Sequence, residues 1–190
     1  FLAENADFAE ICHSSHITFI GPSPESIRAM GNKALARRLM EQAGVPILPG
    51  REVVGDDPEE TLKIAEEIGY PVLIKASGGG GGKGMRIAYT DSSLVSSFQM
   101  ARTEARLAFG TPEVYLERFV PKSRHVEVQV VGDSQGNIIH LGDRDCTIQR
   151  RYQKLIEEAP SPALSPEARE EIGRIAVRAA AAVGYVNAGT

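Results

Sequence analysis

Residues 72–89 decide the fold, and they read VLIKASGGGGGKGMRIAY. The stretches 72–76 and 85–89 have the composition of β-strands, and the glycines between them remove nearly every Cβ atom. Backbone N–H groups in such a segment can approach an anion closely. The pattern predicts a hairpin whose glycine-rich tip, residues 78–84, closes over the phosphates of a nucleoside triphosphate.

Three better-known glycine motifs do not fit this stretch. A Walker A loop needs glycine where Ser77 stands and serine or threonine where Gly84 stands. The dinucleotide fingerprint is met formally by Gly79, Gly81 and Gly84, but it should open a helix, and a strand-like segment follows instead. A kinase loop should be followed by HRD and DFG triplets, which the chain lacks. A flexible surface linker remains the alternative, although Lys75 at the end of the first strand favours a phosphate site.

Start and stop signals on either side of the hairpin predict five helices. The first begins at Ser23, and the other four span residues 32–43, 57–69, 91–109 and 165–184. Further strand-like segments fall at 114–117, 126–131 and 138–141. This mixture predicts an α+β or α/β fold, with one unit over residues 46–120 and a second sheet beginning after Arg124.

Glu117, Arg118, Phe119 and Val120 leave a predicted strand and lead into Pro121. The backbone of such a connector can match the edge of adenine while apolar side chains enclose the ring. An ordinary strand end explains the same residues equally well.

The segment 124–130 alternates with a period of two, so His125, Glu127 and Gln129 should share one face of a strand. Taken alone, His125 is expected to be a hydrogen-bonded surface histidine. A turn at 132–137 should send the chain back as a hairpin.

Four cations and two acids lie within residues 143–154, together with Gln149, Tyr152 and Lys154. Such a cluster can hold an anionic co-substrate. A solvated run of charges is the alternative.

The bulk composition excludes several classes of protein. With 21 basic and 25 acidic residues in 190, the net charge of −4 gives no field that attracts nucleic acid or an anionic membrane. Cys12 and Cys146 lack the spacing of a disulfide framework or a zinc site. We find no membrane-spanning run and no signal peptide, so we expect a cytoplasmic protein.

Taken together, these motifs resemble biotin carboxylase, the ATP-grasp component of acetyl-CoA, propionyl-CoA and pyruvate carboxylases. The resemblance covers essentially all 190 residues and rests on the segments 19–22, 30–33, 75–85, 124–129, 149–154 and 157–160. It implies an ATP-grasp fold that is incomplete at both ends. The implied domains are the end of an N-terminal domain with linker helices (1–47), a lid subdomain with the glycine-rich hairpin (48–120) and the first part of a second subdomain (121–190).

The resemblance also implies a reaction and residue roles. ATP phosphorylates bicarbonate to carboxyphosphate, and the resulting CO2 equivalent passes to biotin on a carrier. Lys154 is expected to neutralise the reacting anion and is the one catalytic candidate. The implied nucleotide residues are Lys33 and Lys75 on the phosphates, Gly81 and Gly82 covering them, Glu117, Arg118, Phe119 and Val120 around adenine, and His125, Gln149 and Tyr152 completing the site.

One residue departs from the family pattern, since the family often has histidine where Tyr152 stands. No metal ligand is expected within the chain, because the implied Mg2+ or Mn2+ ligands lie beyond Thr190. We therefore expect the 190 residues alone to be inactive, which an assay of biotin-dependent ATP cleavage tests. The implied partners are a biotin carboxyl carrier, a carboxyltransferase and a second copy of the full-length chain, with a role in fatty acid biosynthesis.

Two other functions stay open at this point. One is a different ATP-grasp ligase, such as a carbamoyl-phosphate synthetase-like enzyme, which would share the lid and the adenine connector. The other is a non-catalytic nucleotide-binding module. The cluster 149–154 favours biotin carboxylase over the other ligase, and turnover of bicarbonate by the full-length protein would separate it from the non-catalytic module.

Overall fold

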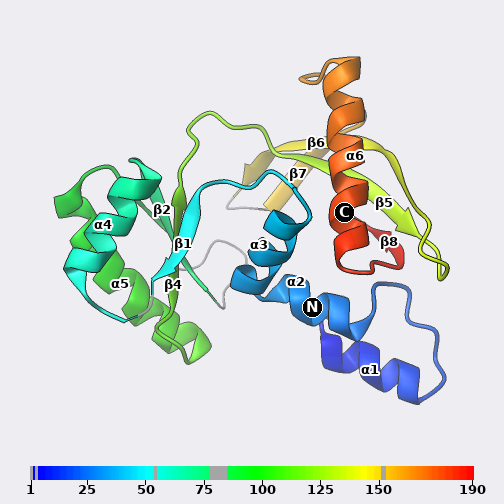
Figure 1. The fold of residues 1–190 in the computed structure, drawn as a ribbon, viewed down its shortest axis with the longest axis horizontal. Helices are drawn as coiled ribbons and strands as arrows, with labels where there is room; N and C mark the ends of the chain where they lie inside the picture. Colours follow the sequence, from blue (N-terminus) through cyan, green and yellow to red (C-terminus); the bar gives the residue numbers. More distant parts are fainter. Residues whose placement is uncertain (1, 3, 54, 78–84, 151–152) are drawn as a thin grey trace. The chain divides into compact units, whose positions relative to one another are not determined.

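The computed structural model describes residues 2, 4–53, 55–77, 85–150 and 153–190 (Figure 1). These residues form two compact units. The first unit contains the residues up to Pro46 together with Arg124–Arg150 and Lys154–Thr190, and the second contains Ile47–Ser123 and Gln153, the first residue of the strand that continues into the first unit. The predicted glycine-rich tip, including Gly81 and Gly82, and Tyr152 lie outside the described residues.

The second unit is built on an antiparallel sheet with the strand order β1-β4-β2-β3. The predicted hairpin is confirmed, because Val72 pairs with Ala88 and Ile74 with Arg86. Along β2 buried and half-buried side chains alternate, which is the pattern of a strand with one face on the core. The strands are β1 (Gly50–Val53), β2 (Val72–Ala76), β3 (Arg86–Ala88) and β4 (Val114–Arg118).

Two helices cover this sheet, α4 (Pro58–Ile68) and α5 (Asp91–Phe109) (Figure 1). The side chain of Asp57 caps α4 by accepting a hydrogen bond from the N–H of Glu59, and Thr90 caps α5 in a capping box with Ser93. The helices bury an apolar stripe against the sheet. The core residues are Val53, Ile64, Ala65, Ile68, Val72, Ile74, Ala76, Ala88, Leu94, Phe98, Ala101, Ala105, Val114 and Leu116.

The first unit is built on a second sheet with the order β7-β6-β5-β8. The pair β5 and β6 is antiparallel, with Val126 opposite Asp145 and an irregularity between Val128 and Val130. Helix α6 packs on β5 and β6. The elements are α1 (Ala6–Ser14), α2 (Pro24–Gly31), α3 (Lys33–Gln42), β5 (Val126–Gly132), β6 (Ile138–Arg150), β7 (Gln153–Glu158), α6 (Pro166–Ala182) and β8 (Asn187–Gly189).

The sequence prediction is too short for β6 and misses β7. It ends the strand at 141, whereas β6 continues through the charged stretch to Arg150. The buried carboxylates of this stretch find hydrogen-bond partners, which offsets the cost of burying them in an extended strand.

The two cysteines of the chain, Cys12 and Cys146, are both buried, and neither forms a disulfide bond. Within the ranges described, none of the helices combines the length and apolar character needed to cross a bilayer.

Candidate functional site

In the second unit, two predicted nucleotide residues meet on neighbouring strands. Lys75 on β2 and Glu117 on β4 are diagonal neighbours, because Lys75 pairs with Tyr115 and Leu73 with Glu117. The ammonium Nζ of Lys75 lies 2.5 Å from Oε1 of Glu117. The Lys75 side chain is 28% exposed and the Glu117 side chain is 15% exposed. The pair therefore offers one cation and one acceptor at the end of the strand that leads into the glycine-rich segment.

Arg118 turns its side chain back into its own unit. Its Nε donates to the carbonyl of Ile68 at 2.8 Å, and Nη2 donates to the same oxygen. Gly69, which follows that carbonyl, has φ +83°, and a Cβ there would lie 2.5 Å from Nη2 of Arg118. The guanidinium thus binds the carbonyl end of α4, where the helix dipole favours a cation. We conclude that the Arg118 side chain is structural, so the prediction that residues 117–120 hold adenine rests, at Arg118, on its backbone.

Two backbone amides of the connector are also occupied. The N–H of Arg118 donates to Pro49 O and that of Phe119 to Pro71 O, each at 2.9 Å. A ligand read by this connector would therefore have to use other groups, such as the amide of the exposed Val120.

In the first unit, the structure brings His125 and Gln149 together. Nε2 of Gln149 lies 2.7 Å from Nδ1 of His125 and donates to the carbonyl of Cys146 at 2.8 Å. Because an amide nitrogen only donates, Nδ1 of His125 accepts, and the ring proton is on Nε2. His125 directly precedes β5 and Gln149 lies at the end of β6, and these two strands run antiparallel.

Lys154 on β7 contacts the carboxylate of Glu127, a partner that the sequence did not predict. Its Nζ donates to Oε2 of Glu127 on β5, whose other oxygen accepts from Nη2 and Nε of Arg144 at 2.6 and 2.7 Å. Arg144 also donates to Oε1 of Gln129 at 3.0 Å, so Glu127 and Gln129 share the polar face that the alternation predicted. The alternation placed Glu127 on this face, but no single-residue signal marked it as the partner of Lys154.

The charges of this cluster support one another. Burial alone would raise the pKa of Glu127, but the hydrogen bonds from Lys154 and Arg144 outweigh it and hold that pKa below its ordinary value. The bond to Glu127 raises the pKa of Lys154. Lys154 therefore stays protonated and positively charged at neutral pH. Its side chain is 37% exposed.

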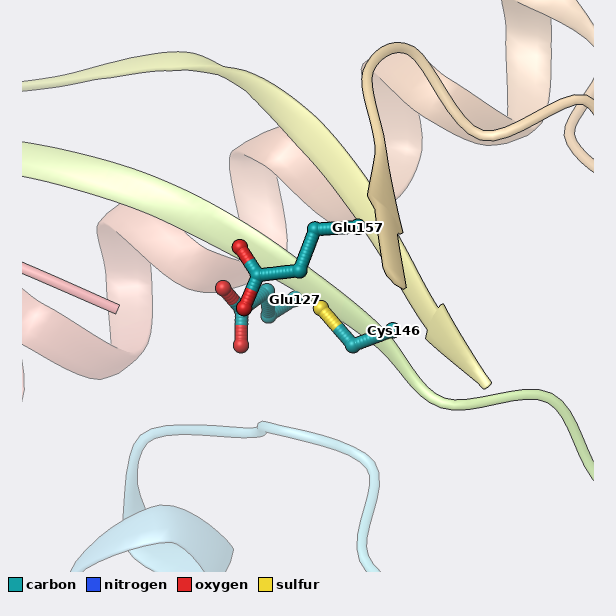
Figure 2. A group of neighbouring side chains, drawn as sticks. All are labelled: Glu127, Cys146 and Glu157. Atoms are coloured by element: carbon teal, nitrogen blue, oxygen red, sulfur yellow. The ribbon is translucent and has the colours of Figure 1, made fainter. Parts of the chain in front are cut away.

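Glu127, Cys146 and Glu157 form a group whose potential ligand atoms lie within 4.8 Å of one another (Figure 2). The donor set does not suit a metal ion. Burial, then the charge of Glu127, raises the pKa of the Cys146 thiol, which disfavours the thiolate that binds metals. Arg144 bonds Glu127 and lies 3.7 Å from Glu157, so a cation already faces both carboxylates. We interpret the group as part of an ion-pair cluster.

Lys33 is the first residue of α3, directly after the N-cap Asn32, whose side chain accepts from the N–H of Leu35. It belongs to the first unit together with His125, Gln149 and Lys154, whereas Lys75 and the connector belong to the second.

Comparison with known proteins connects these features. Residues 32–190 match the family described as "Carbamoyl-phosphate synthase L chain, ATP binding domain", and residues 1–27 match "Biotin carboxylase, N-terminal domain". The whole chain is 56% identical to biotin carboxylase 1 of Bacillus subtilis and 52% identical to a pyruvate carboxylase subunit of Methanothermobacter thermautotrophicus. It covers 42% and 39% of those proteins.

Solved structures give the same picture. The structure of a Campylobacter jejuni biotin carboxylase in complex with "beta-gamma-ATP" superposes with a TM-score of 0.92 at 47% identity, over 99% of this chain and 42% of that one. A Hydrogenobacter thermophilus 2-oxoglutarate carboxylase biotin carboxylase domain dimer, in complex with MgADP, ADP and bicarbonate, gives 0.91 at 51% identity and the same coverage. The chain therefore spans well under half the length of these relatives.

Proposed function

Because the chain belongs to the biotin carboxylases, within the family of carbamoyl-phosphate synthase ATP-binding domains and with their ATP-grasp fold, we propose that it carries nucleotide and bicarbonate contacts of an ATP-dependent ligase. In the proposed reaction a bicarbonate oxygen attacks the γ-phosphorus of ATP, and ADP leaves. The C–O bond of carboxyphosphate then breaks to give CO2 and phosphate, the phosphate accepts the proton of a ureido nitrogen of biotin, and that nitrogen forms the new bond to CO2.

On the second unit we propose that Lys75 binds the nucleotide phosphates and that the connector holds adenine. Glu117 is paired with Leu73 within the sheet, and the amides of Arg118 and Phe119 are occupied, so the Val120 amide is the backbone donor that we assign to the base edge. A carbonyl of the same connector would supply the acceptor for the adenine edge. We assign Gly81 and Gly82 to cover the phosphates, and the compactness of Ile47–Ser123 supports its role as the lid.

On the first unit we propose that Lys154 neutralises bicarbonate or carboxyphosphate. The observation that carries this proposal is the Lys154–Glu127–Arg144 cluster, in which a nearly buried carboxylate holds a partly exposed ammonium as a cation. A fixed cation stabilises negative charge that develops during the reaction better than a freely moving one. His125, Gln149, Lys33 and Tyr152 complete the proposed nucleotide site.

A divalent cation such as Mg2+ would neutralise phosphate charge when bound with ATP. The Glu127, Cys146 and Glu157 group does not fit it, so we assign no ligand for this ion among the described residues and derive no step from it.

We further propose the partners that this reaction requires: a biotin carrier, a carboxyltransferase and a second copy of the full-length chain, in the cytoplasm. The relatives' names support several carboxylases as the parent, because they include biotin carboxylases and a pyruvate carboxylase component. A role in fatty acid biosynthesis is one of these possibilities. The domain boundaries 1–47, 48–120 and 121–190 belong to the same proposal.

The test compares two lysines in the full-length protein that contains these residues. We expect Lys75→Gln to weaken ATP binding about tenfold, since it removes a charged phosphate contact. Lys154→Gln should leave ATP binding within about twofold of wild type and reduce bicarbonate-dependent ADP formation about 10²-fold. Calorimetry with a non-hydrolysable ATP analogue and a coupled ADP assay with free biotin measure the two effects.

Lys63→Gln, an exposed lysine on α4, is the matched control and should change neither quantity. A wild-type protein that binds ATP but forms no ADP with bicarbonate and biotin would favour the non-catalytic module. ADP formation that needs ammonia instead of biotin would favour the carbamoyl-phosphate synthetase-like enzyme.

A further inference from the structure

His125 lies one residue before β5, and yet its backbone is fixed on both sides. Its N–H donates to the hydroxyl Oγ1 of Thr147 at 3.0 Å, and its carbonyl accepts from the N–H of Cys146 at 2.7 Å. The second bond continues the β5–β6 ladder, whereas the first depends on a single side chain. Thr147 therefore supplies the side-chain hydrogen bond that holds the backbone at the residue before β5.

Asp145 in turn fixes Thr147. Its Oδ1 accepts from the N–H of Thr147 at 3.0 Å, and its Oδ2 faces Nη1 of Arg124 and Oγ of Ser161, each at 3.1 Å. Asp145 and Ser161 are buried, with 7% and 1% of their surface exposed. An ionised carboxylate can only accept hydrogen bonds, so the hydroxyl of Thr147 donates its proton to Asp145. The lone pairs of Thr147 Oγ1 then remain to accept from the N–H of His125.

The ionisation of Asp145 agrees with this geometry. Hydrogen bonds from the side chain and backbone of Thr147, followed by those from Arg124 and Ser161, lower the pKa of Asp145 to about 2. The carboxylate is therefore charged, and able to accept these hydrogen bonds, over the whole physiological pH range.

The same segment carries the His125–Gln149 contact. Thr147 stands two residues before Gln149 on β6, and its hydroxyl holds the backbone of His125. The 2.7 Å distance between Nδ1 of His125 and Nε2 of Gln149 thus depends on a strand end that Asp145 and Thr147 keep in place.

We propose that Asp145 and Thr147 are positioning residues, which hold His125 and Gln149 in the geometry that the nucleotide site requires. The inference rests on the proposed function, because it assumes that His125 and Gln149 contact the nucleotide. Neither Asp145 nor Thr147 needs to touch the ligand itself.

The test uses Thr147→Val and Thr147→Ser in the full-length protein. Valine keeps the branched shape and removes the hydroxyl, while serine keeps the hydroxyl. Thr103→Val is the matched control, since Thr103 is exposed on α5 and its hydroxyl donates to a carbonyl of its own helix, that of Gln99. The readouts are KM for ATP, kcat, and residue-resolved hydrogen exchange of the His125 amide without nucleotide.

We expect Thr147→Val to raise KM for ATP three- to tenfold with kcat within twofold, and to speed exchange of the His125 amide at least tenfold. Thr147→Ser should restore both values to within twofold of wild type, and Thr103→Val should change neither. Unchanged exchange in Thr147→Val, or equal effects of valine and serine, would show that the hydroxyl does not position His125.

The exchange measurement separates this inference from the proposed function. If the wild-type protein does not bind ATP, the proposed function fails, and with it the role of Asp145 and Thr147 in a nucleotide site, while exchange still reports whether they fix His125. If Thr147→Val does not fold, the exchange rate of the His125 amide in the wild-type protein tests the inference. A His125 amide that exchanges as fast as the exposed amides of Lys122 and Ser123 would overturn the inference.

Discussion

At the scale of single residues, Asp145 shows how a carboxylate stays charged in a nearly buried position. Hydrogen bonds from Thr147, and then from Arg124 and Ser161, lower its pKa although burial alone would raise it. A group whose pKa is lower in the folded than in the unfolded state stabilises the fold above its unfolded pKa, near 4. This stabilisation is lost as the pH falls from about 4 toward the folded pKa of about 2.

This sign gives a pH prediction. Asp145→Asn should be less stable than wild type at about pH 6, and the difference in free energy of unfolding should shrink steadily below about pH 4. Urea unfolding of both proteins from about pH 6 to about pH 2.5 measures it. Asp133→Asn is the matched comparison, because the pKa of Asp133 is also lowered, but in an exposed turn where Asn137 is the main partner. A wild-type advantage that is constant over the whole range would contradict the assignment.

Residue types and spacing grouped Gln149 with Lys154, whereas only the family resemblance placed His125 with Gln149, and these two side chains do lie 2.7 Å apart. They did not predict Glu127 as the partner of Lys154, because the pairing depends on three strands whose register is set over the whole sheet. They also did not predict the contact of the Arg118 side chain, since its acceptor, the Ile68 carbonyl, lies 50 residues away in sequence. Long-range partners are the information that a local pattern lacks.

At the scale of elements, α5 shows which signals are reliable. Its buried residues Leu94, Phe98, Ala101 and Ala105 recur at intervals of three and four, and both of its ends were predicted correctly. By contrast, β6 was predicted too short and β7 was not predicted, because charged residues normally indicate loops. Their carboxylates and cations are paired with one another, which a one-dimensional pattern does not show.

The stripe on α5 predicts a large difference between two large apolar side chains of the same helix. Phe98→Ala should lower the free energy of unfolding by about 3–5 kcal/mol, because it leaves a cavity in a closed core. Leu107→Ala, at a position that is 82% exposed, should change it by less than about 0.5 kcal/mol. Denaturant titration followed by circular dichroism measures both. Similar losses for the two variants would mean that α5 does not pack through this face.

At the scale of the whole molecule, the chain contains two units with separate sheets. The second has a continuous apolar core, whereas the first relies more on polar contacts such as Asp143 with Arg169 and Ser161. Units with cores of their own commonly unfold as separate cooperative transitions.

We therefore expect the chain to unfold in two steps that respond to different substitutions. Phe98→Ala should lower the midpoint of one step only. Arg169→Met should destabilise the other by about 2 kcal/mol, because it leaves Asp143 buried without its ion-pair partner, after allowing for the partial exposure of Arg169. Calorimetry of the two variants and of the double variant tests this. A single transition that both substitutions lower equally would contradict it.

The position of β7 at the edge of its sheet affects how strongly variants of Lys154 self-associate. β7 is exposed at every residue and lies at the edge of its sheet, where backbone groups can pair with a strand from another chain. The sequence QKLIEE alternates little, and its lysine and glutamates are the features that discourage such self-association. Replacing Lys154 with a neutral residue removes one of these charges beside the exposed Leu155 and Ile156. Aggregation state therefore has to be measured beside turnover in every Lys154 variant, because the ammonium that we propose for the chemistry is also one of the charges that protect this edge.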